Sequence, residues 1–434
     1  MNQRKPVIWR VSRLYPPNFT GAGIQAHRED REFVKLGFSV CVLAAAISAA
    51  KSHGCKPAYL DGIAVQYLPV VSYPIWLNGI RSRVAYKLLF LIFGFFSGSS
   101  FALACIRILL RTGHRGDILI FETVDPFAIV VLGVARLKRL RTIVRMSLMG
   151  DDDPYSRLVR ARRGQAWEYL KLLFFRHVDS VVAISTAMVE SCNHAGLADT
   201  KVVSIPYGVD TRTYKEIDGF SKTEIRQKLE LDRNKQYVVF VGSAIERKGI
   251  DVMIDAFLRL RESLRNVELL IVGPNEFDPR RHYKGRVLQE AVKRCKAKIH
   301  DAGLDLAVHW IGQVDNVCEY MSAADVFCLP TRREGLPIVV IEAMACGLPI
   351  VVACLDGVTT DLITSGDYGT IVHGYDAGDY AMSIMDILTH PEQAINMGQK
   401  ARQRVLSELD LHLTIKKWAE LFNVLSPASG RNSS

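Results

Sequence analysis

Short runs of β-branched and other apolar residues alternate along the chain with longer stretches of helical character. This alternation, repeated through the whole length, predicts parallel sheets covered by helices. The predicted strands are Val7–Val11, Val40–Leu43, Ile118–Phe121, Thr142–Met146, Ser180–Ile184 and Val202–Ile205 in the first half, and Tyr237–Val241, Glu268–Val272, Val308–Trp310, Val326–Leu329, Pro349–Ala353 and Thr370–Val372 in the second.

The pattern breaks once, at Pro206-Tyr207-Gly208-Val209-Asp210 and the polar stretch that follows to about Gln236. We therefore predict an α/β protein of two Rossmann-like domains, residues 1–207 and 208–407, with a hinge near 206–215. A helix over about 408–426 is expected to join the first domain, and residues 427–434 form a Ser-rich disordered tail. Open parallel sheets bind ligands at the carboxyl ends of their strands, so we expect the two domains to face each other across a cleft that holds the site.

One segment is apolar enough to raise the question of a membrane. Residues 88–106 carry no charge between Lys87 and Arg107, which is long enough to span a bilayer. Gly94 and Ser97-Gly98-Ser99-Ser100 favour a loop between two apolar helices instead. A single span would also separate strands that belong to one sheet. We expect helices that are buried or that dip into a membrane face.

Charge and cysteine content limit the partners and the cellular location that we expect. The net charge of +10 is uneven: residues 1–200 carry +12 and residues 201–434 carry −2. A basic first domain fits an anionic membrane surface, a phosphorylated acceptor or nucleic acid, and also a basic protein without such a partner. The nine cysteines are scattered without metal-site spacing. Because the start shows no signal peptide, we expect a reducing, cytoplasmic location. Within the cytoplasm, the protein could also bind the inner face of the membrane.

The most informative segment runs from Thr331 to Gly347. It follows a predicted strand, starts a helix near Pro337 and ends it at Gly347. Backbone N–H groups at a helix start can bind phosphate, and Glu342, one turn further on, can accept hydrogen bonds from ribose hydroxyls. Glu334, just before the helix, can reach a sugar beyond a diphosphate. Two glutamates spaced in this way could equally flank an ordinary buried helix.

A second loop supplies a cation. Val239–Val241 is followed by Gly242-Ser243-Ala244-Ile245-Glu246-Arg247-Lys248-Gly249, a loop that leads into a helix. Lys248 in this loop can neutralise a diphosphate. An isolated lysine in a loop is more often simply solvated, so the prediction depends on the two loops acting together.

Together these residues resemble glycosyltransferase family 4, the retaining group with the GT-B fold. The resemblance covers nearly the whole chain. It includes the Tyr15–Gly23 loop, the linker Ile205–Asp210, Val272-Gly273-Pro274, Ala324–Phe327 and the Glu-x7-Glu block through Pro349.

The resemblance implies a role for each site residue. Lys248 would bind the donor diphosphate, Glu334 the transferred sugar and Glu342 the ribose. Ser243 and Arg247 would lie beside the diphosphate, Val314 would meet the base through its backbone, and Gly21 and Gly23 would close onto the diphosphate from the first domain. Phosphate would be held at the helix start, formed by Gly335, Leu336, Pro337, Ile338 and Val339.

The chain departs from the family pattern in two places. Ser243 stands where the family usually has an arginine, with Arg247 as a potential substitute. The family often has a histidine after the strand Thr142–Met146, whereas here the segment leads into Asp151, Asp152 and Asp153. Asp151 and Asp152 could contact the acceptor or the donor sugar, or the triplet could cap the next helix. The resemblance implies phosphate neutralisation by lysine and a helix dipole, so we expect neither a metal nor a cofactor.

These features predict a glycosyltransferase that moves a sugar from a nucleotide-diphosphate sugar to a glycan or lipid-linked acceptor, such as a surface-polysaccharide precursor. Stabilisation of the leaving diphosphate would be the main protein contribution. Alternatives are a nucleotide-sugar 2-epimerase or a sucrose- or trehalose-forming relative, and a non-catalytic partner subunit that binds nucleotide-sugar. Nucleic acid is not an expected partner, because no interleaved aromatic and basic stretch is present.

Overall fold

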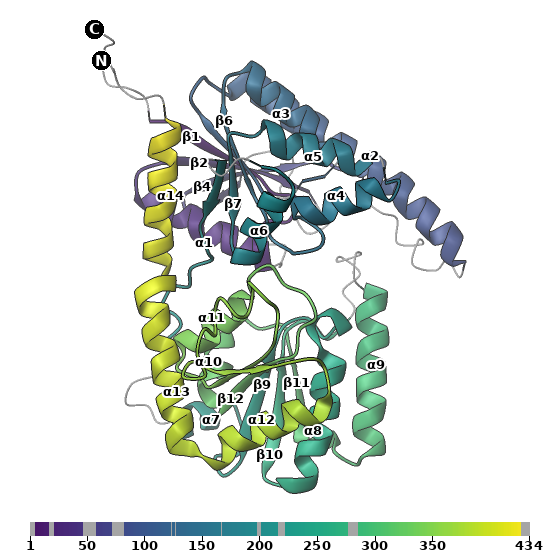
Figure 1. Cartoon of the computed structure of the whole chain (residues 1–434), viewed down its shortest axis with the longest axis vertical. Helices are drawn as coiled ribbons and strands as arrows, with labels where there is room; N and C mark the ends of the chain where they lie inside the picture. Colours follow the sequence, from purple (N-terminus) through teal and green to yellow (C-terminus); the bar gives the residue numbers. More distant parts are fainter. Residues whose placement is uncertain are drawn as a thin grey trace. The chain divides into compact units, whose positions relative to one another are not determined.

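The structure is a computed structural model that describes residues 5–16, 21–46, 58–71, 82–122, 124–125, 127–165, 167–197, 201–215, 222–276 and 285–426. The predicted tail 427–434, residues Pro17–Thr20 of the first loop and Cys55 lie outside the described residues. The chain divides into two compact units, Met1–Pro206 with Thr414–Ser434, and Tyr207–Leu413. Each unit is built on its own sheet (Figure 1).

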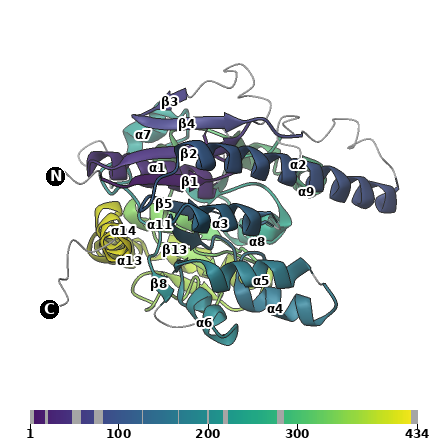
Figure 2. The same cartoon turned by 90° about the horizontal axis from the view of Figure 1, so that it is seen from above.

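The first unit holds an eight-stranded sheet in the order β3-β4-β2-β1-β5-β6-β7-β8, parallel except for the β3–β4 pair. Helix α1 lies on one face of this sheet and helices α2 and α3 lie on the other (Figure 2). The strands are β1 (Val7–Val11), β2 (Ser39–Ala45), β3 (Ala58–Leu60), β4 (Ile63–Leu68), β5 (Ile118–Phe121), β6 (Arg141–Arg145), β7 (Ser180–Ala183) and β8 (Val202–Ser204). The helices are α1 (Gly21–Lys35), α2 (Arg83–Thr112), α3 (Ala128–Leu137), α4 (Pro154–Arg162), α5 (Trp167–His177), α6 (Thr186–His194) and α14 (Leu411–Leu425).

The second unit holds a six-stranded parallel sheet in the order β11-β10-β9-β12-β13-β14. The strands are β9 (Gln236–Val241), β10 (Val267–Val272), β11 (Val308–Gly312), β12 (Val326–Leu329), β13 (Ile350–Ala353) and β14 (Thr370–Val372). The helical elements are α7 (Lys222–Lys228), η4 (Glu246–Lys248), α8 (Ile250–Ser263), α9 (Gly285–Asp301), η5 (Asp305–Ala307), α10 (Val317–Ala323), α11 (Ile338–Ala345), α12 (Ala377–Thr389), α13 (Pro391–Arg404) and the π-helical turn η6 (Val405–Leu409).

All twelve predicted strands are present, with ends that differ by no more than two residues. Two strands were missed, β3 and β4. They form an antiparallel hairpin whose turn is Asp61-Gly62, with φ of 51° and 81°. An Asp-Gly pair with positive φ at both positions is typical of a type I′ hairpin turn, so the signal was present in the sequence.

The expected loop within residues 94–100 is wrong. Ser97, Gly98, Ser99 and Ser100 lie inside the single 30-residue helix α2. The serine hydroxyls are accommodated by bonding within the helix: Ser99 and Ser100 donate to the carbonyls of Phe96 and Ser97, both at 3.1 Å. Gly98 meets the ring of Phe127, at a point where a Cβ atom would lie 2.6 Å from the ring. Gly98 therefore permits close packing instead of breaking the helix.

Five charged side chains are buried together in the first unit. Arg10 on β1 and Arg145 on β6 are bound by Glu29 and Asp30 of α1 and by Glu122 after β5. Burial raises the pKa of Asp30, whereas at Glu122 the two arginines outweigh burial and lower the pKa. Breaking one partner of such a network leaves an uncompensated buried charge, so it joins α1 to the sheet at specific positions.

Candidate functional site

The strand order of the second unit places the site. Starting from β9, strands β10 and β11 are added on one side, and β12, β13 and β14 are then added on the other. This is the doubly wound arrangement, and its switch point lies between β9 and β12. Ligands bind such sheets beyond the carboxyl ends of the two strands at this switch point. The loop after β9 carries Arg247 and Lys248, and the loop after β12 carries Glu334. The fold therefore brings the two most informative loops of the sequence to one place.

Lys248 and Glu334 form a direct ion pair, with Nζ 2.6 Å from Oε1. Arg247 Nη1 lies 3.4 Å from the same oxygen and donates to the Arg333 carbonyl at 2.6 Å. Thr331 Oγ1 donates to Glu334 at 2.9 Å. Glu334 is 7% exposed. Burial would raise its pKa, but Lys248 and Arg247 outweigh burial and lower it, so the carboxylate stays ionised.

Glycines allow these loops to approach one another. Gly249 ends η4 with φ of 79°, and a Cβ atom there would lie 1.9 Å from the Pro330 carbonyl oxygen. Gly273, after β10, has φ of 130°, and a Cβ atom there would lie 2.4 Å from the Gly242 carbonyl oxygen. Only glycine fits both the conformation and the space. The loop of Lys248 thus rests directly on the loop that leads to Glu334.

Helix α11 begins one residue later than expected, with Pro337 at its N-cap and no side chain capping it. Its first backbone N–H groups are those that can receive an anion. Glu342 lies one turn into the helix and is 5% exposed. Gly347 follows the C-terminal cap with φ of 73°, and the Gly347 and Leu348 N–H groups bond back to Met344 and Ala343, as the sequence predicted for the helix end.

The remaining residues predicted for the donor site follow neighbouring strand ends. Ser243 follows β9 after Gly242, and its carbonyl accepts from Ile245 N at 2.8 Å. Val314 is half-buried in the loop between β11 and α10. Gly335 and Leu336 are buried, whereas Ile338 and Val339 are half-buried. All site residues predicted in the second unit therefore lie beyond the carboxyl ends of the strands of one sheet.

Gly21 and Gly23, expected either in a loop that closes onto the diphosphate or in a plain helix-entry turn, lie in the first turn of α1. The reason is that α1 starts early, at Gly21 itself. A Cβ atom at Gly21 would meet nothing within 4 Å among the described residues, so none of these contacts requires glycine at this position. A role of the two glycines towards the donor stays a prediction.

The three aspartates after β6 differ in their contacts and in their exposure. Asp153 caps α4, accepting from Ser156 N at 2.8 Å, and binds the Ser191 hydroxyl at 2.6 Å. Asp152 accepts from Ser147 Oγ at 2.5 Å, and burial raises its pKa. Asp151 is exposed. The capping interpretation thus applies to Asp153, and the proposed roles of Asp151 and Asp152 stay predictions.

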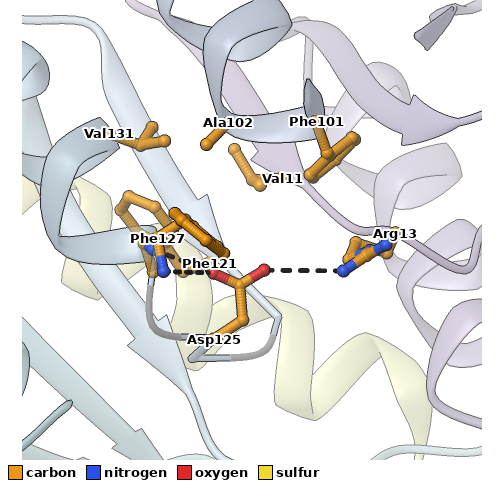
Figure 3. A pocket seen from close by; sticks show the side chains of 9 residues that line it. Val11, Arg13, Phe101, Ala102, Phe121, Asp125, Phe127 and Val131 are labelled. Carbon is orange, nitrogen blue, oxygen red and sulfur yellow. Dashed lines mark hydrogen bonds and ion pairs between the residues drawn. The ribbon is translucent and has the colours of Figure 1, made fainter. Parts of the chain in front are cut away.

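The first sheet has its own switch point, between β1 and β5, and a pocket lies there (Figure 3). Arg13, after β1, and Asp125, after β5, face each other across it at 3.8 Å. Arg13 also donates to Ser97 of α2 at 2.7 Å. Sequence reasoning missed this pair, although both positions follow predicted strands. The apolar lining comes from the two strands and from α2 and α3: Val11, Phe101, Ala102, Phe121, Phe127, Ala128 and Val131.

Within the described part of the chain, no group of three or more His, Cys, Asp or Glu side chains is arranged to hold a metal ion. Among the same residues, one helix segment is long and apolar enough to cross a membrane, Leu91–Thr112 of α2, of which 28% is buried. The strands before and after α2, β4 and β5, belong to one sheet, and Phe101, Cys105 and Leu109 pack into the unit. This packing is that of a crossover helix with one open side.

Comparison with known proteins identifies the class. Residues 20–208 match the family of glycosyl transferase 4-like domains, and residues 221–404 match the glycosyl transferases group 1. The two matches together span most of the chain, which belongs to the family 4 glycosyltransferases. The sucrose-phosphate synthase of Thermosynechococcus elongatus superposes with a TM-score of 0.77 at 19% identity, over 97% of this chain and 99% of that one. The fold is GT-B.

Curated relatives are more similar in sequence but match over about half of the chain. The lipopolysaccharide core biosynthesis mannosyltransferase LpsB of Rhizobium meliloti is 28% identical over 48% of this chain and 54% of its own. A GDP-mannose-dependent phosphatidylinositol monomannoside mannosyltransferase of Mycolicibacterium smegmatis is 29% identical over 50% of this chain and 55% of its own. The chain spans about half the length of the curated relatives it matches.

Proposed function

We propose that the protein is a retaining glycosyltransferase that uses a nucleotide-diphosphate sugar as donor. The observation that carries the proposal is the Lys248–Glu334 pair, joined at 2.6 Å on the two loops of the switch point and set beside the open start of α11. A carboxylate and a cation at such a place suit a ligand with hydroxyl groups at one end and phosphates next to them.

In this proposal each group has one task. The N–H groups at the start of α11 and the Lys248 ammonium bind the diphosphate and stabilise the charge that develops on it as the bond to the sugar breaks. Glu334 accepts hydrogen bonds from the sugar, and Glu342 from the ribose. The acceptor hydroxyl attacks the face that the diphosphate leaves, which is the retaining outcome expected of the family. Without donor, Lys248 and Glu334 neutralise each other.

Arg247 supplies the second positive charge in place of the customary arginine at position 243. Its guanidinium already lies within 3.4 Å of Glu334, on the same loop as Lys248. The Arg247 side chain is less than one-quarter exposed, and its guanidinium donates to the Arg333 carbonyl. A fixed, partly desolvated cation interacts with a diphosphate more strongly than a freely solvated one.

The acceptor is proposed to be lipid-linked or a precursor of a cell-surface polysaccharide, met at the cytoplasmic face of a membrane. The pocket at the first switch point joins a charged pair, Arg13 and Asp125, to an apolar wall from α2. The two mannosyltransferase relatives are named for lipopolysaccharide core synthesis and for a phosphatidylinositol mannoside. The open side of α2 is apolar, and residues 1–200 carry +12, which favours an anionic lipid surface.

The test is a thermal-shift screen of the full chain with UDP-, GDP- and ADP-sugars, run beside Lys248→Ala and Glu342→Ala. We expect one nucleotide family to raise the unfolding temperature, and both variants to lose most of that rise. Matched controls are Lys228→Ala, an exposed lysine of α7, and Glu420→Ala, an exposed glutamate of α14, which should respond as the parent does.

The outcomes separate the alternatives. A folded protein that none of the nucleotide-sugars stabilises would contradict the proposal and leave a non-catalytic partner subunit as the better explanation, in line with Ser243. Binding followed by release of free nucleotide without any transferred sugar would point to an epimerase.

A further inference from the structure

Two thiols lie against each other in the second unit, behind the helix that carries Glu342. Cys318 is in the first turn of α10, and Cys346 caps the C-terminal end of α11. Their Sγ atoms are 3.7 Å apart and share a hydrogen bond. Cys318 is half-buried and Cys346 is buried. The two helices are therefore already in contact through the pair of atoms that a disulfide would join.

The two thiols are not equivalent. The hydrogen bond with Cys346 lowers the pKa of Cys318 to about 7, and the same bond raises the pKa of Cys346. Either sulfur can donate in this hydrogen bond, and Cys318 Sγ also lies 3.3 Å from the Thr213 carbonyl oxygen; with the lower pKa, Cys318 is the sulfur that ionises first. A thiol with a pKa near the ambient pH is the more reactive nucleophile. The neighbouring thiol is placed to attack that sulfur once it has been oxidised, which forms a disulfide.

We propose that Cys318 and Cys346 are a redox-active pair that forms a reversible disulfide on contact with a peroxide. The Cys318 thiolate attacks one oxygen of hydrogen peroxide, and the O–O bond breaks to give Cys318 sulfenic acid and hydroxide, which takes up from solvent the proton that the Cys318 thiol had released and becomes one water. The Cys346 sulfur then attacks the sulfenic sulfur, the S–S bond forms, the S–O bond breaks, and the Cys346 proton leaves with the hydroxyl as a second water. Two thiols lose two electrons and one peroxide gains them.

The disulfide also acts on the donor site, a step that rests on the proposed function. A disulfide holds its sulfurs at about 2.05 Å, so α10 and the end of α11 must shift to close the present 3.7 Å. The Cys346 N–H bonds the Glu342 carbonyl at 3.1 Å, so the shift is passed to the turn that holds the ribose-binding carboxylate. Oxidation therefore weakens nucleotide binding.

Peptide mapping of the full chain after treatment with hydrogen peroxide tests the pair. We expect a cross-linked peptide containing Cys318 and Cys346, two hydrogens lighter than the free thiols, which dithiothreitol separates. It should be absent in Cys318→Ser and in Cys346→Ser and should persist in Cys354→Ser, a half-buried cysteine of the same unit. Irreversible oxidation of Cys318 without a cross-link, or loss of the cross-link in Cys354→Ser, would overturn the proposal.

Nucleotide binding to reduced and oxidised protein tests the coupling. The dissociation constant should rise several-fold on oxidation, return with dithiothreitol, and stay constant in Cys318→Ser. An equal affinity in both states, with the disulfide mapped, would overturn the coupling. A reduced protein that binds no nucleotide would overturn the proposed donor site instead, while a mapped cross-link would still support the redox pair.

Discussion

At the scale of single residues, the site depends on a charge balance and on one glycine. Glu334 is buried and ionised because Lys248 lies 2.6 Å away, and Lys248 is held there because the chain turns sharply at Gly249. A carboxylate that has been desolvated and paired in advance needs little rearrangement when a ligand with hydroxyl groups arrives. The same balance makes the site sensitive to substitutions that leave the rest of the unit intact.

Gly249→Ala should destabilise the second unit by about 3 kcal/mol or more. The left-handed conformation by itself costs alanine about 1 kcal/mol, and the new Cβ would meet the Pro330 carbonyl at 1.9 Å. The matched control is Gly374→Ala, with φ of 84° and nothing within 4 Å, for which only the conformational cost of about 1 kcal/mol is expected. Chemical denaturation of both variants provides the comparison. Equal losses would show that the contact with Pro330 does not constrain the loop.

Glu334 should make the stability of the second unit depend on acid. Its pKa is lowered in the folded protein, so its contribution is complete above the unfolded value of about 4.3 and is lost as the pH falls through the lower folded value. In Glu334→Gln the unfolding temperature should therefore fall less steeply than in the parent below about pH 4.5. Glu420→Gln, at an exposed position of α14, is the control. A variant with the slope of the parent would contradict the ionised state of Glu334.

At the scale of elements, α2 has two different sides. Phe101, Cys105 and Leu109 are buried in the unit. Other apolar side chains of the helix are exposed, along its outer side and on the N-terminal part, which extends past the sheet of its unit (Figure 2). Such a helix can lie in the interface of a bilayer without spanning it. The exposed apolar side chains are Leu88, Leu91, Ile92, Phe95, Phe96, Leu103 and Leu110, between 42% and 69% exposed.

Replacing Leu91 and Phe95 together by serine should remove most binding to anionic vesicles, such as phosphatidylglycerol. Each fully inserted apolar side chain contributes roughly 1.5–3 kcal/mol, so the double change should weaken binding at least tenfold. Co-sedimentation measures it. Leu306→Ser is the control, because Leu306 is 93% exposed and lies in the second unit. A parent protein that stays in solution with these vesicles would remove the support for a membrane-bound acceptor.

At the scale of the whole molecule, the first unit is built from both ends of the chain. Helix α14 belongs to it from Thr414 onward. Trp418 and Phe422 pack edge-on against Phe33 of α1, and the Trp418 ring lies 5.9 Å from the Arg145 guanidinium carbon. Helix α14 thus packs on the buried charged cluster of the first sheet, so the unit is complete only after α14 has been made.

Trp418→Ala should destabilise the first unit by about 3–5 kcal/mol, because it leaves a large cavity beside Phe33 and the Arg145 guanidinium. Val424→Ala on the same helix removes a side chain that is 81% exposed and should change stability by less than about 0.5 kcal/mol. Hydrogen exchange of α1 and β1 reports on the unit itself. Unchanged protection there in Trp418→Ala would mean that α14 adds little to the unit.

The sequence by itself determined twelve of the strands, the α/β class and the two loops that carry Lys248 and Glu334. These features are local: a buried parallel strand is a continuous apolar run, and a helix start or end is marked by neighbours such as Pro337 and Gly347. The hairpin β3–β4 was also readable, from Asp61-Gly62, although it was missed. Lys248 and Glu334 could be named because each stands in a recognisable loop after a strand.

Only the tertiary structure decided how these pieces meet. Sequence does not state that β9 and β12 are neighbours, and this adjacency is what places Lys248 2.6 Å from Glu334. The serines and glycine of residues 97–100 were taken for a loop because their local preference is for turns, whereas packing of Gly98 on Phe127 keeps them helical. Arg13 with Asp125, and Cys318 with Cys346, are pairs between distant segments. Such pairs exist only once the sheet order has brought the segments together.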